Sequence, residues 1–172
     1  MRRHRMLDLG EGSKAIGSLR PEIAAEWGVS TDVTVVGGGG DNAVAACGVG
    51  ALREGDAFVS LGTSGVLLAA KDTFSPMPAS AVHTFCHAVP NRWYQMGVIL
   101  AATDSLNWLA RNLDVEAAAL SDALGNQING PNQIQFLPYL SGERTPHNDR
   151  NIREALQNIE IASNRNDQKQ EG

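Results

Sequence analysis

Residues 37–43 hold four glycines in a row followed by Asp41, Asn42 and Ala43, a combination that suits ligand chemistry. Glycine loses more backbone freedom on folding than any other residue, so four together weaken a packed element unless the backbone must approach something closely. Asp41 stands at the expected start of an Ala-rich helix, where the helix end favours the ionised carboxylate that a general base needs. Asp at such a junction is more commonly a helix N-cap, so both interpretations of Asp41 remain open.

A second candidate site is the segment Gly62, Thr63, Ser64 and Gly65, which lies between two apolar segments. As the tip of a tight hairpin it would offer backbone N–H groups and two hydroxyls, a set of donors that suits phosphate oxygens. An ordinary glycine-bearing turn would have the same composition. The segment is not a Walker loop, because no Gly-Lys-Ser/Thr sequence follows it.

The third candidate is the irregular, charged segment 141–149, Ser-Gly-Glu-Arg-Thr-Pro-His-Asn-Asp. Glu143 and Arg144 could simply pair with each other on the surface, which stabilises a fold only weakly. Their position between Ser-Gly and Thr-Pro-His suits a binding loop equally well.

His83, Cys86 and His87 are spaced closely enough to suggest a metal site. On a strand, however, His83 and Cys86 would point to opposite faces, and no fourth ligand is evident, so no metal is predicted. Cys47 and Cys86 are expected to be buried, reduced thiols of a cytoplasmic protein.

An α/β fold must position these residues. Eighteen glycines and seven prolines among 172 residues suit a turn-rich α/β architecture, and 42% hydrophobic residues suffice for a core. The net charge of −5 argues against nucleic acid or an anionic membrane as the main partner. The basic residues 2–5 lack the apolar region of a signal peptide, and no apolar run approaches the roughly 20 residues of a membrane span.

Periodicity, glycines and prolines predict the elements themselves. Helices are expected at 19–27, 42–52, 102–112 and 114–124, the second starting from an Asp41 or Asn42 cap and the last from an Asp114 cap. Strands are expected at 33–36, 56–61, 66–70, 83–88, 93–100 and 136–140. The order predicts a mixed sheet with helices packed on it. After Arg153 the chain becomes rich in Asn, Gln and charge, which predicts disorder or loose helix.

Three motifs together carry a family resemblance: Gly-Gly-Gly-Gly-Asp-Asn-Ala at 37–43, Ser-Leu-Gly-Thr-Ser-Gly at 60–65, and Phe-Leu-Pro-Tyr-Leu-Ser-Gly-Glu-Arg-Thr-Pro-His-Asn-Asp at 136–149. Between about Gly10 and Arg153 the chain resembles the FGGY carbohydrate kinases, and most closely those that phosphorylate D-xylulose. The resemblance implies a partial ribonuclease-H-like α/β domain of the actin and hexokinase ATPase type.

The resemblance also implies an activity: transfer of the γ-phosphate of ATP, with Mg²⁺, to D-xylulose, with gluconate, ribulose and glycerol as alternative acceptors. In this scheme Asp41 is the catalytic base and contacts the sugar, and Asn42 lies beside the sugar. Gly62, Thr63, Ser64 and Gly65 would bind the phosphates of ATP. Glu143, Arg144, Thr145 and Pro146 would border the cleft.

The sequence also departs from the family pattern. The Asp and glycine-rich turn of the family's first lobe and its C-terminal adenosine-binding segment are not found, and Arg150 stands where the family usually has Pro. We therefore expect residues 1–153 to be the N-terminal part of the second, C-terminal lobe, and residues 154–172 to be an unrelated, disordered tail. Such a fragment should be inactive alone and could self-associate through its exposed half-core. A non-catalytic protein that binds a nucleotide or a partner is the alternative from another class.

Overall fold

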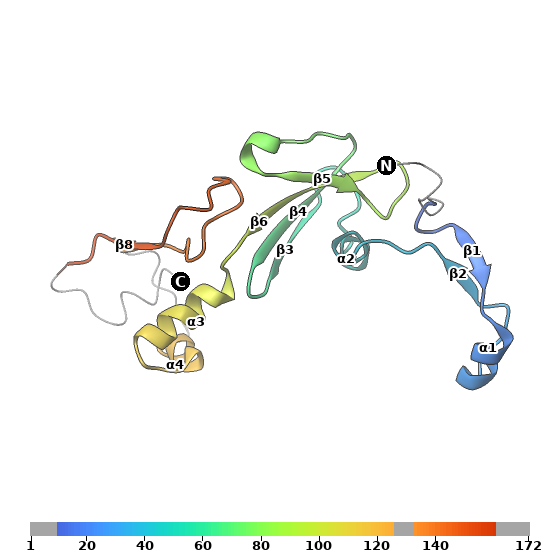
Figure 1. Ribbon diagram of the computed structural model, residues 1–172, viewed down its shortest axis with the longest axis horizontal. Helices are drawn as coiled ribbons and strands as arrows, with labels where there is room; N and C mark the ends of the chain where they lie inside the picture. The colour runs from blue at the N-terminus through green and yellow to red at the C-terminus, as the bar shows by residue number, and fades with distance from the viewer. Residues whose placement is uncertain (1–9, 126–132, 161–172) are drawn as a thin grey trace. The chain divides into compact units, whose positions relative to one another are not determined.

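The computed structural model describes residues 10–125 and 133–160 (Figure 1). Contacts between Cα atoms divide these residues into two compact units. The first unit holds the described residues up to Phe58 together with Leu68–Ser75 and Thr84–Gln95. The second holds Val59–Leu67, Pro76–His83 and the described residues from Met96 onward.

A small hairpin sheet and a short helix open the first unit. Strand β1 (Ala15–Ser18) pairs antiparallel with β2 (Thr34–Val36), with a register irregularity between Ala15 and Gly17. Helix α1 (Pro21–Trp27) lies between them, with Pro in its first turn and Gly28 at φ +66° closing it. The predicted helix and strand are both confirmed. Strand β1 was not predicted, because Ala-Ile-Gly-Ser shows neither apolar alternation nor a run of β-branched residues.

Helix α2 (Asp41–Val49) follows the four glycines directly. Its N-cap is Gly40, so the prediction that Asp41 or Asn42 caps the helix is wrong; Asp41 is instead the first helical residue. Ala43 and Ala46 are its buried residues, and their small side chains allow close packing. The helix ends at Gly50, whose φ of +82° is a left-handed conformation that glycine adopts readily.

The central element is a four-stranded sheet in the order β3-β4-β6-β5. Its strands are β3 (Ala57–Leu61), β4 (Gly65–Lys71), β5 (His83–Cys86) and β6 (Trp93–Ile99), and a 3₁₀ turn (Pro78–Ser80) precedes β5. All four strands were predicted, each to within a few residues. Strand β3 lies at an edge, and β4 next to it contributes the fully buried Leu68 and Ala70.

Two helices and a second two-stranded ladder complete the second unit (Figure 1). Helix α3 (Thr103–Asn112) and helix α4 (Ala117–Asp122) pack through a core of Leu109, Ala110 and Leu120. Strand β7 (Gln135–Leu137) pairs antiparallel with β8 (Ala155–Gln157). The ring of Phe136 on β7 stacks on Trp108 of α3 at a centroid distance of 5.8 Å.

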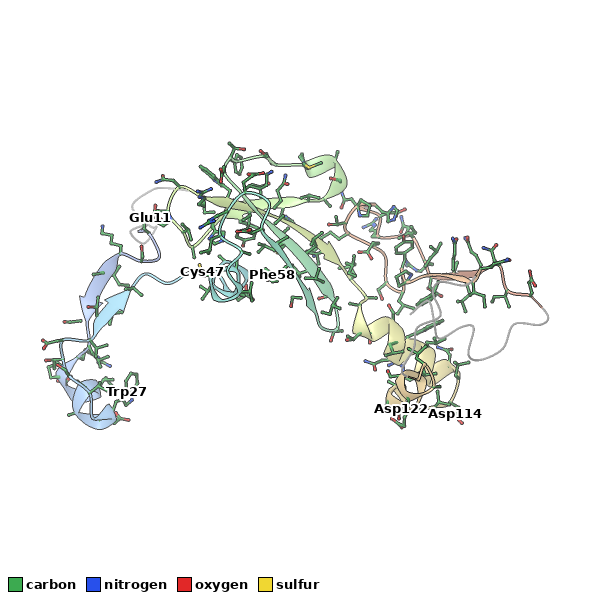
Figure 2. The ribbon with its side chains drawn as sticks, turned by 180° about the vertical axis from the view of Figure 1, so that it is seen from behind. Glu11, Trp27, Cys47, Phe58, Asp114 and Asp122 are labelled. Carbon is green, nitrogen blue, oxygen red and sulfur yellow. The ribbon has the colours of Figure 1, made fainter. Side chains whose placement is uncertain are left out.

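Two predictions fail in this unit. Asp114 does not cap α4: it lies in a turn at φ +53°, and the cap is Glu116 (Figure 2). The prediction that the chain is disordered or loosely helical after Arg153 is wrong at β8, because Leu156 pairs with Phe136 across the β7–β8 ladder. Residues 161–172 of the predicted tail lie outside the described residues.

Candidate functional site

The glycine run forms one wall of a cavity of about 610 Å³ in the first unit. Three backbone segments and the start of α2 line it, and it is open to solvent; the lining residues are Gly10, Glu11, Gly12, Lys14, Gly38, Gly39, Gly40, Ala43, Cys86, His87 and Ala88. The opposing charges of Glu11 and Lys14 and the thiol of Cys86 give the cavity polar functional groups. Lys14 and Glu11 lie far from the glycine run in sequence and belong to none of the three motifs, so sequence reasoning missed them.

Gly37, which belongs to the glycine run, and Gly12, which does not, lie so close to other backbone that neither position has room for a side chain. A Cβ atom at Gly37 would lie 2.8 Å from the carbonyl oxygen of Glu11, and one at Gly12 would lie 2.4 Å from that of Gly38. Real Cβ atoms essentially never approach this closely. The segments are joined by hydrogen bonds from Gly37 N to Lys14 O (3.1 Å) and from Gly38 N to Gly12 O (2.9 Å). The close approach predicted for the glycines is therefore made, at least in part, to this chain's own backbone.

Gly40 has a different role, because a Cβ atom there would meet nothing within 4 Å. It caps α2 and delivers Asp41 to the first helical position, where the carboxylate is exposed. Asp41 Oδ1 accepts hydrogen bonds from the backbone N–H of Asn42 (2.7 Å) and from the Asn42 side-chain amide (3.3 Å). These bonds orient the carboxylate. Asp41 and Asn42 therefore contact each other, and their shared role at one sugar stays a prediction.

The Asp41 carboxylate affects the pKa of Tyr94, a residue of β6. Burial raises the pKa of the Tyr94 phenol above its ordinary value of 10.0, and the negative charges of Asp41 and then Cys86 raise it further. The Tyr94 ring contacts Phe85, with centroids 5.6 Å apart, and meets the His87 ring edge-on at 6.1 Å. Sequence reasoning missed Tyr94, since a lone aromatic residue in a strand carries no functional signal.

His87 has a structural role. Its ring is buried, its Nδ1 accepts from the Val89 N–H (3.0 Å), and Nε2 lies 3.0 Å from the Ala51 carbonyl oxygen. Because Nδ1 is an acceptor, Nε2 carries the proton and donates to Ala51, so both ring nitrogens are bonded to backbone. Among the described residues no group of three or more His, Cys, Asp or Glu side chains is arranged to hold a metal ion.

The cysteine prediction is half wrong. Cys47 on α2, labelled in Figure 2, and Cys86 on β5 are free thiols, as predicted, but both are exposed rather than buried. Cys47 lies on an exposed face of α2, opposite to what the usual burial of free cysteine had predicted.

In the second unit, the turn from Gly62 to Gly65 joins β3 to β4. Its carbonyl groups face the start of α3: Ala102 N donates to Thr63 O (2.8 Å) and Thr103 N donates to Gly62 O (3.0 Å). The Thr103 hydroxyl also donates to Gly62 O (2.8 Å). No side chain caps α3, so the turn satisfies backbone donors that a helix start otherwise leaves unpaired. Thr63 and Ser64 are exposed at the tip.

The loop that holds Glu143 to Pro146 belongs to the same unit, and Glu143 in it is only 3% exposed. Its Oε1 accepts from the N–H of Leu100 (3.0 Å) and from that of Arg144 (2.6 Å). The surface ion pair between Glu143 and Arg144 is therefore a wrong interpretation: the carboxylate is buried and bonded to backbone, whereas Arg144 is exposed.

Thr145 joins the same loop to β6. Its N–H donates to Val98 O (3.1 Å), and its hydroxyl accepts from Val98 N (3.1 Å) and donates to Ala81 O (3.2 Å). The peptide bond from Thr145 to Pro146 is cis. Arg144, with Ser141, Asn148 and Arg150, lines a hollow of about 300 Å³ next to Glu143.

Comparison with known proteins matches residues 57–169 to the FGGY family of carbohydrate kinases, C-terminal domain. The match continues past Arg153, where the motifs had predicted that the likeness ends. No helix among the described residues is long and apolar enough to cross a membrane.

Curated relatives include the xylulose kinases of Escherichia coli K12, 49% identical over 147 residues, and of Klebsiella pneumoniae, 48% identical over 149 residues. Each alignment covers 85% of this chain and 30% of the relative. A stretch of that size includes Asp41, the 62–65 turn and Glu143 wherever it begins. The chain thus spans about 30% of the length of the curated relatives it matches.

Solved structures agree with these matches. A xylulose kinase from Brucella ovis superposes with a TM-score of 0.89 at 50% identity, covering 94% of this chain and 33% of that one. Structures of sugar kinases with this likeness have the actin- and hexokinase-like ATPase fold, which confirms the predicted fold class. Because the family model matches well over half of the residues, the chain belongs to the FGGY family of carbohydrate kinases.

Proposed function

We propose that this chain supplies a general base and a phosphate-binding turn to an ATP-dependent sugar kinase that acts on D-xylulose. The observation that carries the proposal is the exposed carboxylate of Asp41 at the first position of α2, held by Asn42 and preceded by a glycine-lined cavity. This carboxylate takes the proton of the attacking sugar hydroxyl, and Asn42 lies beside the sugar. Xylulose kinase relatives at 38–49% identity support this choice of reaction.

In the same proposal the turn at Gly62, Thr63, Ser64 and Gly65 binds phosphate oxygens of ATP. Its exposed tip and the two hydroxyls of Thr63 and Ser64 support this role. Mg²⁺ would enter with the nucleotide, since this ion is held mostly by phosphate oxygens, water and one or two carboxylates. Phosphoryl transfer depends mainly on positioning and charge neutralisation.

D-Xylulose is favoured over other acceptors by the identity of the relatives. A gluconate kinase from Lactobacillus acidophilus and a glycerol kinase from Plasmodium falciparum superpose at TM-scores of 0.80 and 0.76, but at 22% and 18% identity. At that level the likeness supports the fold alone. In the same proposal the loop that holds Glu143, Arg144, Thr145 and Pro146 borders the cleft in which the sugar and ATP bind.

The activity is tested with purified chain, ATP and D-xylulose in a coupled assay of ADP release. We expect negligible turnover, because residues that hold both substrates in line supply much of the rate and the chain spans about 30% of its relatives. Turnover near that of a complete xylulose kinase would refute the expectation that this chain alone lacks part of the substrate-binding residues. Gluconate, ribulose and glycerol serve as comparison substrates.

A non-catalytic protein that binds a nucleotide is the alternative function. Calorimetric titration of the chain with ATP separates the two: tight binding by the chain alone would favour the alternative, because the kinase proposal gives this chain only a phosphate-binding turn for the nucleotide.

The exposed edge strand β3 supports self-association as a further property. Val59 and Leu61 lie on one face of this strand and are 61% and 67% exposed. Unpaired edge strands with apolar side chains favour pairing with another chain. We expect light scattering to detect species larger than the monomer, and Val59→Lys to reduce them; a monomer at all concentrations would contradict this expectation.

A further inference from the structure

We propose that Glu143 and Thr145 are positioning residues of the 62–65 turn, which they orient through the end of β6 and the start of α3. The phosphate-binding role of the turn rests on the proposed function; its positioning does not. All of these residues belong to the second unit. Hydrogen bonds join the loop to β6 and the start of α3 to the turn, and the backbone of residues 98–103 connects the two sets of bonds.

The first step fixes the backbone at the end of β6. Glu143 is almost fully buried, and a buried carboxylate is costly unless its oxygens are bonded. Its Oε1 accepts from the Leu100 N–H at 3.0 Å, just after β6 ends at Ile99. A side chain that must keep this bond holds Leu100 in place, two residues before the segment that contacts the turn.

Thr145 fixes the same strand two residues earlier. Both backbone groups of Val98 are bonded to it: the N–H donates to the Thr145 hydroxyl, and the carbonyl accepts from the Thr145 N–H, each at 3.1 Å. The Thr145 methyl group would lie 3.3 Å from a Cβ atom at Gly97, so the neighbouring glycine allows the loop to approach closely. The two side chains therefore hold the last residues of β6 from the same loop.

The second step passes from β6 to the turn. Ala102 N and Thr103 N donate to the carbonyl oxygens of Thr63 and Gly62, and the Thr103 hydroxyl adds a second bond to Gly62 O. The peptide unit is planar and trans, so the N–H of a peptide points opposite to its C=O. With the Gly62 and Thr63 carbonyls directed at α3, the N–H groups of Thr63 and Ser64 are directed away from it. In the proposed function these N–H groups, with the two hydroxyls, are available to phosphate oxygens.

A third contact anchors the far side of the turn. A Cβ atom at Gly65 would lie 2.7 Å from Cγ1 of Ile99 and 3.3 Å from Cβ of Ala102. The turn is therefore in contact with the end of β6 at Gly65 and with the start of α3 at Gly62 and Thr63. A displacement of residues 99–102 must move or loosen the turn.

The test measures amide hydrogen exchange in the complete 172-residue chain. Thr145→Val removes the hydroxyl and Thr145→Ser keeps it; Glu143→Leu removes the acceptor and Glu143→Gln keeps an oxygen. In Thr145→Val and Glu143→Leu we expect the Ala102 and Thr103 amides to exchange about tenfold faster, the effect of roughly one lost hydrogen bond. Thr145→Ser and Glu143→Gln should restore most of the protection. The Ala24 amide in α1, bonded to Arg20 O, serves as the reference in the other unit.

A second readout links positioning to ligand binding. Inorganic pyrophosphate is titrated into each variant, and the amide shifts of Thr63 and Ser64 are followed; we expect weaker binding in Thr145→Val than in Thr145→Ser. Faster exchange at Leu100 and Val98 with unchanged exchange at Ala102 and Thr103 would overturn the inference. If the unsubstituted chain fails to bind pyrophosphate, the phosphate role of the turn is refuted, while the exchange data still decide the positioning. Should Glu143→Leu also deprotect Ala24, it has unfolded, and Thr145→Val decides the outcome.

Discussion

Gly12 lies against Gly38 of the glycine run, so replacing Gly12 by alanine tests whether contact between backbone segments accounts for part of that run. The new Cβ atom would lie 2.4 Å from the carbonyl oxygen of Gly38 and 3.3 Å from its carbonyl carbon. Both atoms are backbone, so the clash cannot be relieved by rotating a side chain. The segment around Gly12 must move away from Gly38, and the wall of the cavity that precedes Asp41 opens.

The magnitude follows from the bonds that this movement breaks. Gly38 N donates to Gly12 O at 2.9 Å, and Gly37 N donates to Lys14 O at 3.1 Å. Each bond is worth about 0.5–1.5 kcal/mol. Because Lys14, Gly37 and Gly38 are exposed and Gly12 is only partly buried, the freed groups bond to water, and we expect a total near the lower end, about 1–2 kcal/mol.

The assay is amide hydrogen exchange of Gly37 and Gly38 in the purified chain. A loss of that size should speed their exchange by roughly five- to thirtyfold. Gly17→Ala is the matched control, since it lies nearby in strand β1 and a Cβ atom there meets nothing within 4 Å. Unchanged exchange in Gly12→Ala, or equal acceleration in Gly17→Ala, would refute the reasoning that backbone contact selects these glycines.

Two further predictions concern α2 and Tyr94. Gly48→Ala should raise the free energy of unfolding by up to about 0.5–1 kcal/mol, because the position is helical and open; Gly50→Ala should lower it by about 1–2 kcal/mol, because φ is +82° there. Thermal unfolding of the two variants measures both changes, and equal effects would contradict the different backbone conformations given to Gly48 and Gly50. Tyr94, its pKa raised by burial and then by Asp41, contributes stability that is present below pH 10.0 and is lost as pH rises through the raised value. Ultraviolet titration of tyrosinate, with Tyr94→Phe as reference, should place Tyr94 above 10.0, and Asp41→Asn should lower it; no change in Asp41→Asn would contradict the proximity.

Local rules predicted most of the elements, for identifiable reasons. Pro21 and Gly28 mark both ends of α1, and Gly50 ends α2 at a positive φ that few other residues adopt. The strands β3 and β4 on either side of the 62–65 turn could be predicted because two apolar runs are separated there by turn residues. Strands β1 and β8 were missed because each is short and depends on its partner strand rather than on its own residue pattern.

The site was predicted less completely, since its contacts join distant parts of the chain. Nothing near Glu143 in sequence indicates that it is buried against Leu100, 43 residues away. The approach of Gly12 to Gly38 is equally invisible in the sequence and explains part of a glycine run first attributed to a ligand. Asp41, by contrast, could be singled out from its position between the glycines and an Ala-rich segment, because helix geometry places such a residue at the exposed end.

The central claim is that Asp41 acts as the base of a D-xylulose kinase. The most direct measurement replaces the aligned segment of the Escherichia coli xylulose kinase with residues 10–153 of this chain and follows D-xylulose-dependent ADP release. We predict an active chimera whose kcat falls by about 10²- to 10⁴-fold in Asp41→Asn, the usual contribution of a general base. An active chimera in which Asp41→Asn leaves kcat unchanged would contradict the claim.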